Sequence, residues 1–305
     1  MKDKKICSKC EKKAIIEIKW KKRSYCKQHF IEYFLGQVKK ALRNKKYGKI
    51  EKNIKICVAI SGGKDSLSCL HAMKRLGFNI EALHINLGFS KISEKSLEVC
   101  KNFCESIEVK LNVIDLKKDY GFSLPELFEK NFNKATCKMC GTIRRYLINK
   151  FAFENGFDYI ATGHNLSDIT AQGINTLLSN YFIGFRSFSP VTNPIKEFKI
   201  CGRLKPLFFL TDEENKLYAR LNNINYFKEK CEYGLKSPLN ILKKHLKSLE
   251  KETPGILRRL AFSFISFGKF IEKHKGKSFG ICKQCGYPSA TNICDFCRIV
   301  KNMKN

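Results

Sequence analysis

No stretch of the sequence approaches the roughly 18 consecutive apolar residues of a membrane-spanning helix, and the charged N-terminus lacks the apolar segment of a signal peptide. Acidic residues are scarce as well: the 305 residues include 28 Asp and Glu against 58 Lys and Arg, a net charge of +30. The first two absences predict a cytoplasmic protein without a membrane partner. The excess of positive charge predicts a polyanionic partner, most simply a nucleic acid.

Two common nucleotide-binding loops are also missing, since neither G-x-x-x-x-G-K-[ST] nor G-x-G-x-x-G occurs. What the sequence has, between an apolar and a helical segment, is Ser61-Gly62-Gly63-Lys64-Asp65-Ser66. Backbone N–H groups at a helix start hold anions, and glycines let the backbone approach a phosphate closely. The segment therefore predicts a phosphate-binding loop, against the simpler interpretation of a strand-to-helix turn with capping serines.

Cysteine is plentiful, at 15 residues, and much of it falls into close pairs. In a cytoplasmic chain such pairs indicate metal or redox chemistry rather than structural disulfides. Each end of the chain supplies four ligands as two close pairs, namely Cys7, Cys10, Cys26 and His29, and then Cys282, Cys285, Cys294 and Cys297. Four protein ligands close a tetrahedron around zinc and leave no open position, so we expect two structural zinc sites rather than chance clusters of thiols.

Between the quartets, apolar and helical segments alternate. Strands are expected at 55–60, 79–87, 110–116 and 158–164, and helices at 66–76, 91–107, 141–155 and 168–178. This alternation predicts an α/β fold whose parallel sheet carries helices on both faces. After Pro190 the pattern is irregular and then mainly helical. We expect an N-terminal zinc finger with a linker helix at 1–48, a catalytic domain at 49–240, a helical extension at 241–275 and a zinc ribbon at 276–305.

The remaining cysteines divide into two groups. Cys137 and Cys140 form a C-x-x-C pair ahead of a helical segment with Arg144 and Arg145, and Cys231 lies far along the chain. The rest are expected in the core: Cys57, Cys69, Cys100, Cys104 and Cys201.

The loop S-G-G-x-D-S resembles that of the PP-loop ATP pyrophosphatases, which adenylate an oxygen of their substrate and release pyrophosphate. Within that superfamily the chain is most similar to the TtuA/NcsA type of tRNA 2-thiolation enzyme. The resemblance covers nearly the whole chain and rests on the order of its motifs: the N-terminal finger, the loop, Cys137-Lys-Met-Cys140-Gly141, Ala161-Thr-Gly163-His164-Asn165, Arg203-Leu-Lys205-Pro206-Leu207, Cys231 and the C-terminal four-cysteine module. One departure is Ser167, where the family usually has an acidic residue.

The resemblance implies a PP-loop fold (adenine nucleotide alpha hydrolase-like) that binds ATP with Mg²⁺. The implied nucleotide contacts are Ala59, Ser61, Gly62, Gly63, Lys64, Asp65, Ser66, His84, Ile85, Arg144, Gly163, His164 and Asp168. Asp65 and Asp168 are further expected to act in catalysis, as Mg²⁺ ligands or by ordering a water. For His84 a satisfied core histidine is a nearly equal alternative.

In the family the corresponding three cysteines hold a four-iron, four-sulfur cluster. The resemblance therefore implies that Cys137, Cys140 and Cys231 ligate such a cluster and act in catalysis, because three thiolates leave one iron open to bind sulfide. The residues alone leave other possibilities open: a disulfide or persulfide at the C-x-x-C pair, or a further zinc site.

The implied reaction is the 2-thiolation of a tRNA uridine, in which ATP adenylates the C2 oxygen and sulfur then replaces it without net redox. Implied partners are tRNA, a sulfur donor (free sulfide or a ubiquitin-like thiocarboxylate protein) and a second copy of the chain. Alternatives are another PP-loop tRNA modifier (a cytidine 2-thiolase or a lysidine-forming ligase), a zinc-ribbon nucleic-acid-binding protein with a degenerate ATP site, and an oxidoreductase built on Cys137 and Cys140.

Overall fold

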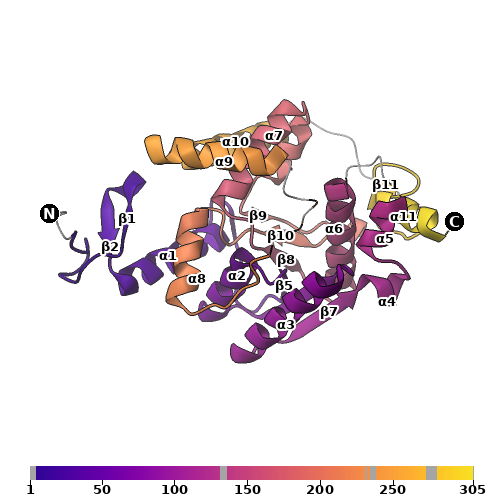
Figure 1. The fold of residues 1–305 in the computed structure, drawn as a ribbon. Coiled ribbons are helices and arrows are strands. Elements are labelled where there is room, and N and C mark those ends of the chain that lie inside the picture. Colours follow the sequence, from indigo (N-terminus) through magenta and orange to yellow (C-terminus); the bar gives the residue numbers. More distant parts are fainter. Residues whose placement is uncertain are drawn as a thin grey trace.

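The computed structural model describes residues 5–130, 136–229, 231, 233, 238–272 and 280–304. A six-stranded sheet lies at its centre, in the order β7-β6-β5-β8-β10-β9 (Figure 1). Its strands are β5 (Ile56–Ile60), β6 (Ile80–Asn86), β7 (Leu111–Asp115), β8 (Tyr159–Thr162), β9 (Val191–Thr192) and β10 (Gly202–Leu204). All neighbours are parallel except β9, which runs antiparallel to β10 at the edge.

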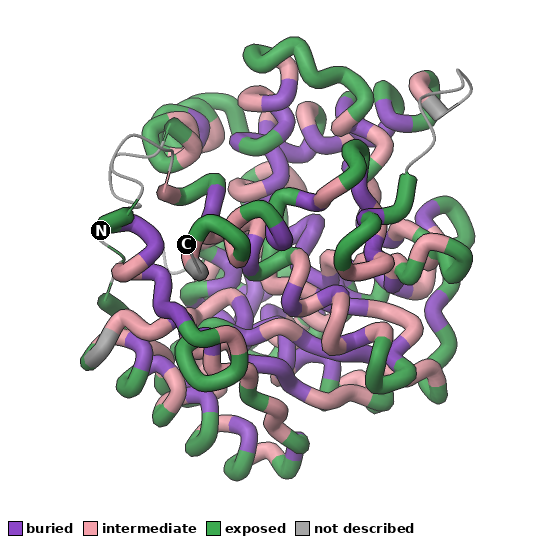
Figure 2. The backbone as a smooth tube through the Cα atoms, turned by 90° about the vertical axis from the view of Figure 1, so that its right-hand side faces the viewer, coloured by how far each residue is buried: buried purple, intermediate pink, exposed green. Residues whose placement is uncertain are grey.

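Both faces of this sheet are buried, as the sequence predicts. Strand β5 reads Ile-Cys-Val-Ala-Ile without a polar residue, as expected for a parallel strand covered on two sides. Its Ile56, Val58 and Ile60 pack with α1 (Lys27–Leu42), α2 (Lys64–Arg75), α3 (Ser90–Ser106) and α8 (Asp212–Leu221), whereas Cys57 packs on the other face with α6 (Thr136–Glu154). Figure 2 shows the result along the backbone, with buried strands inside and exposed turns of helix outside. The five cysteines expected in the core are all buried.

The four predicted crossover helices are present. They are α2 (Lys64–Arg75), α3 (Ser90–Ser106), α6 (Thr136–Glu154) and α7 (Leu166–Leu178), with α1 (Lys27–Leu42) before and α8 (Asp212–Leu221) after them. Helix α6 begins five residues earlier than expected, so Cys137 and Cys140 lie in its first turns rather than ahead of it. Short helices α4 (Leu116–Tyr120) and α5 (Leu124–Lys130) connect β7 to α6.

Two further helices cover α7 on the side of the molecule drawn at the top of Figure 1, α9 (Pro238–Glu252) and α10 (Ile256–Glu272). A side chain at Gly173 of α7 would stand 2.1 Å from the ring of Phe264 in α10, so glycine permits this close crossing. Within the apolar stretch 257–270 of α10, Leu257, Phe264 and Ile265 are buried. No helix of the described residues is long and apolar enough to span a bilayer.

The cysteine-rich ends form two small modules at opposite ends of the molecule (Figure 1). In the N-terminal module (residues 5–42), the hairpin β1 (Ile16–Ile18) and β2 (Arg23–Tyr25) precedes α1. In the C-terminal module (residues 280–304), the hairpin β11 (Gly280–Ile281) and β12 (Pro288–Ser289) precedes α11 (Asp295–Lys304). The remaining short elements are β3 (Arg43–Asn44), β4 (Gly48–Lys49) and the 3-10 turns η1 (Lys19–Lys21), η2 (Phe182–Ser187) and η3 (Lys196–Phe198).

Candidate active site

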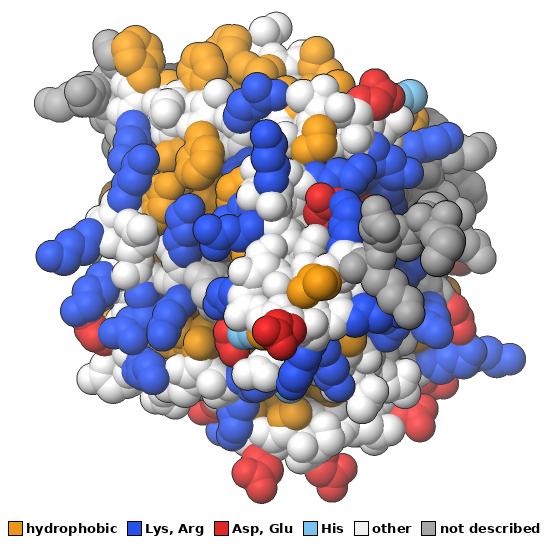
Figure 3. Space-filling model, turned by 90° about the vertical axis from the view of Figure 1, so that its left-hand side faces the viewer, with side chains coloured by type: hydrophobic (Ala, Val, Ile, Leu, Met, Phe, Trp, Pro, Cys, Tyr) orange, Lys and Arg blue, Asp and Glu red, His pale blue; other side chains and the backbone are white. Residues whose placement is uncertain are grey.

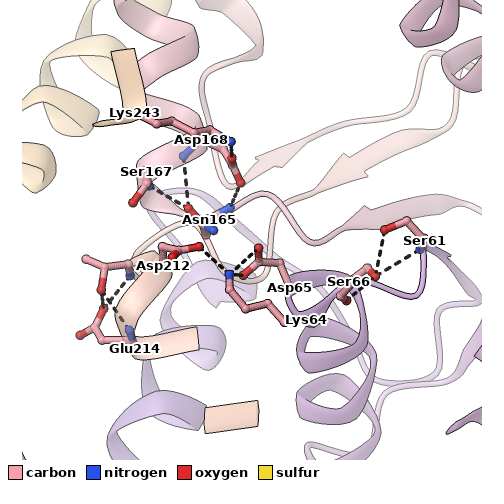
Figure 4. Close-up of polar contacts among 12 residues, drawn as sticks. Ser61, Lys64, Asp65, Ser66, Asn165, Ser167, Asp168, Asp212, Glu214 and Lys243 are labelled. Carbon is pink, nitrogen blue, oxygen red and sulfur yellow. Dashed lines mark hydrogen bonds and ion pairs between the residues drawn. The ribbon is translucent and has the colours of Figure 1, made fainter. Parts of the chain in front are cut away.

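The glycine-rich segment forms the turn between β5 and the N-terminus of α2, as predicted. Gly62 has a φ of +75°, and a side chain there would stand 3.0 Å from the carbonyl oxygen of Ser96. Ser66 Oγ accepts a hydrogen bond from the Ser61 N–H (3.2 Å) and donates one to the Gly63 carbonyl (2.9 Å) (Figure 4). These two hydrogen bonds fix the shape of the turn at the N-terminus of α2. A turn that leads into a helix N-terminus in this way is suited to bind phosphate.

Lys64 does not point at this turn but at two carboxylates (Figure 4). Its ammonium group donates to both oxygens of Asp65 (2.9 and 2.8 Å) and to Asp212 at the start of α8. Burial disfavours the charged amine, yet Asp65 and Asp212 outweigh it and raise the pKa of Lys64. Burial, together with Asp168 and Asp212, raises the pKa of Asp65 although Lys64 opposes this. Asp212 was not expected from the sequence.

The end of β8 lies directly against the start of α2. A side chain at Gly163 would stand 2.7 Å from the backbone carbon of Asp65 and the backbone nitrogen of Ser66, so glycine is required at this contact. The next residue, His164, has a solvent-accessible ring whose Nδ1 is 2.7 Å from Thr162 Oγ1. Desolvation by the surrounding protein lowers the pKa of His164. The positive charges of Lys205 and Lys243 lower the pKa further, whereas the negative charge of Asp168 raises it.

Asp168 caps helix α7 and forms an ion pair with Lys243 of α9 (Figure 4). The Asn165 side chain accepts from the N–H groups of Ser167 (2.9 Å) and Asp168 (3.2 Å), and the Asp168 carboxylate accepts from the Asn165 N–H (3.0 Å). This is a reciprocal capping box. Burial would raise the pKa of Asp168, but Lys243 and His164 outweigh it and lower the pKa, so the group is an ionised carboxylate. Ser167 takes part in this cap only through its backbone N–H. Any residue other than proline supplies that group, so the cap does not depend on the serine side chain.

His84 lies at the carboxyl end of β6, opposite Ile60 in β5. Its ring is buried, and Nδ1 is 3.2 Å from the Ile60 carbonyl oxygen and 3.4 Å from Cys100 Sγ. Burial lowers the pKa of His84 to about 4, and Arg144 contributes to the lowering. Its Nε2 has no hydrogen-bond partner among the described residues. Nδ1 therefore makes the contacts expected of a core histidine, which was one of the two alternatives from the sequence. Nε2 could still bind a ligand. Ala59 and Ile85, the other expected contacts, lie in these two strands.

The three inner cysteines approach one another from distant parts of the chain. Cys137 donates from Sγ to the backbone carbonyl of Tyr233 (3.4 Å), and both Cys137 and Cys231 are exposed. Burial raises the pKa of Cys140, and Cys231 and Cys137 add to the increase, whereas Arg144 opposes it. Their sulfur atoms are not among the ligand groups of the described residues that lie within 4.8 Å of one another. Among the described residues the trio therefore does not form a compact ligand group like the two at the ends of the chain.

The two terminal quartets are much tighter. In each, all four ligand atoms lie within 4.8 Å of one another. His29 Nδ1 is 3.3–3.4 Å from the sulfurs of its three cysteines, and Cys10 Sγ is 3.8 Å from Cys26 Sγ. In the C-terminal quartet Cys285 Sγ is 3.8 Å from Cys294 Sγ. A tetrahedron with zinc–sulfur bonds of about 2.3 Å has an edge of about 3.8 Å, so both quartets match zinc geometry.

A protein-family model described as a PP-loop domain matches residues 32–249. The chain is 34% identical over 298 residues to the tRNA-5-methyluridine(54) 2-sulfurtransferase of Thermotoga maritima, with 98% of this chain and 97% of that protein covered. It is 36% identical over 293 residues to the Pyrococcus horikoshii protein of the same name, with 96% and 92% covered. Among solved structures it is similar to the U34-tRNA thiolase NcsA from Methanococcus maripaludis with its [4Fe-4S] cluster, at a TM-score of 0.81, 28% identity and 99% and 97% coverage.

Proposed function

We propose here how the residues of this chain carry out tRNA 2-thiolation. The premise is that the chain belongs to the PP-loop family of tRNA 2-sulfurtransferases. The observation that carries the proposal is the geometry of the phosphate loop: Gly62 has a φ of +75°, and Gly163 at the end of β8 packs against the backbone of Asp65 and Ser66 at the start of α2. The charge of Arg144 acts on both His84 and Cys140, which favours one reaction centre for the nucleotide and the inner thiols.

The nucleotide would lie at the carboxyl ends of β5, β6 and β8, where ligands of open α/β sheets bind. Gly62, Gly63 and the N-terminus of α2 receive its phosphates, and His84 and Ile85 flank the adenosine. Lys64 is drawn from Asp212 towards the phosphates. The uridine C2 oxygen then attacks the α-phosphate, pyrophosphate leaves, and the loop N–H groups and Lys64 stabilise the charge that develops. Asp65 and the ionised Asp168 would bind Mg²⁺ or order a water, and His164 would border the same space.

Cys137, Cys140 and Cys231 would hold the cluster. Support comes from the contact of Cys137 Sγ with the Tyr233 carbonyl, which brings the segment around Cys231 to the start of α6, and from the [4Fe-4S] cluster of the similar NcsA structure. When bound, the cluster supplies an iron without a protein ligand, at which sulfide can be presented. Arg144 and Arg145 provide positive charge beside the thiolates, and the partly buried position of Cys140 excludes water from one side of the site.

Sulfur then attacks C2 of the adenylated uridine, and AMP leaves with the original oxygen. The donor would be free sulfide or a ubiquitin-like thiocarboxylate protein, each of which delivers sulfur at the same oxidation state. We propose uridine 54 as the target. The support is that three relatives at 34%, 36% and 32% identity carry that position in their names, whereas a fourth at 33% is named only a probable sulfurtransferase and the U34 thiolase is 28% identical.

The terminal quartets are proposed as structural Zn²⁺ sites, closed by four protein ligands each. The division at 1–48, 49–240, 241–275 and 276–305 and a cytoplasmic location remain part of the proposal. A homodimer is supported by exposed apolar side chains around the end of α7 and η2: Leu178, Tyr181 and Phe182 are 72%, 61% and 49% exposed. Light scattering of the wild type and Leu178→Lys would test the dimer, which the charge should weaken.

The cluster is tested by the metal content of anaerobically purified protein. We compare the wild type with Cys137→Ala/Cys140→Ala/Cys231→Ala, and use Cys104→Ala, a buried cysteine outside the trio, as the matched control. About four irons per chain that disappear only in the triple variant, with two zincs kept in all three proteins, are expected. Two zincs and no iron after anaerobic reconstitution would rule out the cluster and leave a persulfide on the trio.

A further inference from the structure

A chain of alternating cations and aromatic rings joins the N-terminal module to α10. Lys21 Nζ lies 5.3 Å from the centre of the Trp20 ring, and the Arg258 guanidinium lies 4.0 Å from the same ring. Arg258 is also 5.8 Å from the ring of Phe209, over which Lys40 Nζ lies at 5.0 Å. Three positive charges from three separate elements are therefore gathered around two rings.

These charges are not balanced by acidic groups. No carboxylate of the described residues forms an ion pair with Lys21, Lys40 or Arg258. Glu214, which accepts hydrogen bonds from the Tyr33 hydroxyl (2.7 Å) and from Thr211, is near enough to act on Lys21, but its single negative charge does not offset three positive ones. The cluster therefore keeps a net positive charge where three segments meet.

Arg258 shows how unusual this arrangement is. The residue is 6% exposed, and its guanidinium donates to the Phe209 carbonyl (2.5 Å) and to Gln37 (3.4 Å), both neutral. Its Nε has no hydrogen-bond partner among the described residues. A buried charge without a counter-ion is costly, and it becomes favourable when an anion binds close by. Burial lowers the pKa values of Lys21 and Lys40, and Arg258 contributes to both.

The surface around the cluster fits the same kind of ligand. Figure 3, seen from the side of the N-terminal module, shows many basic side chains with fewer acidic ones between them. Lys40 is exposed and Lys21 is half-buried, so their ammonium groups are accessible while Arg258 acts from beneath. The ring faces are already occupied by cations, which leaves charge rather than base stacking as the means of recognition.

We propose that Lys21, Lys40 and Arg258 form a seat for the phosphate backbone of the substrate RNA, with the lysines in contact with phosphate and Arg258 supplying buried charge. The inference rests on tRNA being the substrate. Contacts of this kind fix the position of an RNA without reading its sequence. The seat would therefore anchor the tRNA body while the target base enters the reaction centre.

The test is the salt dependence of binding of an unmodified tRNA transcript to the full-length, zinc-loaded protein. Each phosphate contact contributes about 0.7–0.9 to the slope of log affinity against log salt. Lys21→Gln/Lys40→Gln should reduce the slope by about 1.4–1.8 and weaken binding about tenfold at 0.1 M salt. The matched control is Lys74→Gln/Lys101→Gln, which removes the same charge from exposed positions on α2 and α3.

Both variants should keep the wild-type circular dichroism, zinc content and ATP affinity. A wild-type slope in Lys21→Gln/Lys40→Gln would overturn the seat and leave the proposed function intact. A wild-type protein that does not bind tRNA would overturn both. An equal loss of slope in the control would also overturn the seat, because the effect would then come from net charge alone.

Discussion

The ring of Tyr146 stacks on the ring of Phe296, with centroids 3.9 Å apart and planes 10° apart. Tyr146 belongs to α6, the helix whose first turns carry Cys137 and Cys140, and Phe296 lies between two cysteines of the C-terminal quartet. One apolar cluster includes both rings and also Cys140. The C-terminal module is therefore packed directly on the helix that presents the inner thiols, and its integrity supports their position.

Phe296→Ala should disturb both sites at once. Phe296 is 5% exposed, and removal of a buried Phe side chain typically costs about 3–5 kcal/mol. We expect a lower free energy of unfolding in urea and a reduced iron content after reconstitution. Ile281→Ala in the same module, where the side chain is 54% exposed, serves as the control and should change neither. Full iron loading in Phe296→Ala would show that the module does not support the inner thiols.

Gly163→Ala should abolish tight ATP binding. The added carbon would stand 2.7 Å from backbone atoms of Asp65 and Ser66, which cannot turn aside as a side chain would. We expect an ATP affinity at least tenfold lower in calorimetry. Gly36→Ala is the control, because nothing lies within 4 Å of its added carbon and the residue is in helix α1. That change should leave ATP binding intact and stabilise the fold by up to about 1 kcal/mol. Wild-type affinity in Gly163→Ala would contradict the placement of the nucleotide.

Asp212→Asn should tighten the binding of ATP in the absence of Mg²⁺. Asp212 and Asp65 both hold Lys64, so the phosphates compete with two carboxylates for one ammonium group. Removal of one competitor should increase the affinity severalfold, equivalent to about 1 kcal/mol. Glu213→Gln, which removes a carboxylate from the adjacent position paired with Lys247, should have no effect. Weaker binding in Asp212→Asn would mean that Asp212 aligns Lys64 instead of competing with the phosphates.

The buried His84 should make stability depend on pH. Burial lowers the pKa of His84 to about 4, whereas the unfolded chain takes up this proton near pH 6.5. Between these values the unfolded state binds more protons, so stability is complete above about pH 6.5 and is lost as the pH falls towards 4. The slope contributed is at most about 1.4 kcal/mol per pH unit.

Urea unfolding at several pH values measures this contribution. His84→Gln should unfold with a shallower pH dependence than the wild type in that window, and His245→Gln, an exposed control, should not. Zinc loss at low pH affects all three proteins alike, so the difference between them isolates His84. An unchanged slope in His84→Gln would show that the histidine is not kept neutral by burial.

The sequence predicts the centre of the fold well because most residues in each strand from β5 to β8 are apolar and helical segments alternate with these strands. It misses β9 and β10, which have two and three residues and are too short to show a period. These strands are fixed by pairing: Leu204 lies opposite Ala161 of β8 and Val191 of β9. Long-range hydrogen bonds, rather than local composition, decide such elements.

The candidate site shows the same division. The loop and the two quartets are local patterns, and the structure places their residues together as expected. Asp212 and Lys243 leave no such signal, because a lone charged residue on a helix resembles any solvated position. They enter the site through the packing of α8 against α2 and of α9 against α7. The sequence also predicts Cys137 and Cys140 ahead of a helix at 141–155, whereas the structure begins this helix at Thr136.

The central claim is that the uridine C2 oxygen is adenylated and leaves on AMP. A tRNA substrate carrying ¹⁸O at C2 of the target uridine tests it most directly, with ATP, sulfide and anaerobically reconstituted protein. Mass spectrometry should find one ¹⁸O atom in AMP for each 2-thiouridine formed, mapped to position 54, and no product without ATP. Unlabelled AMP, or release of ADP and phosphate in step with thiolation, would contradict the account.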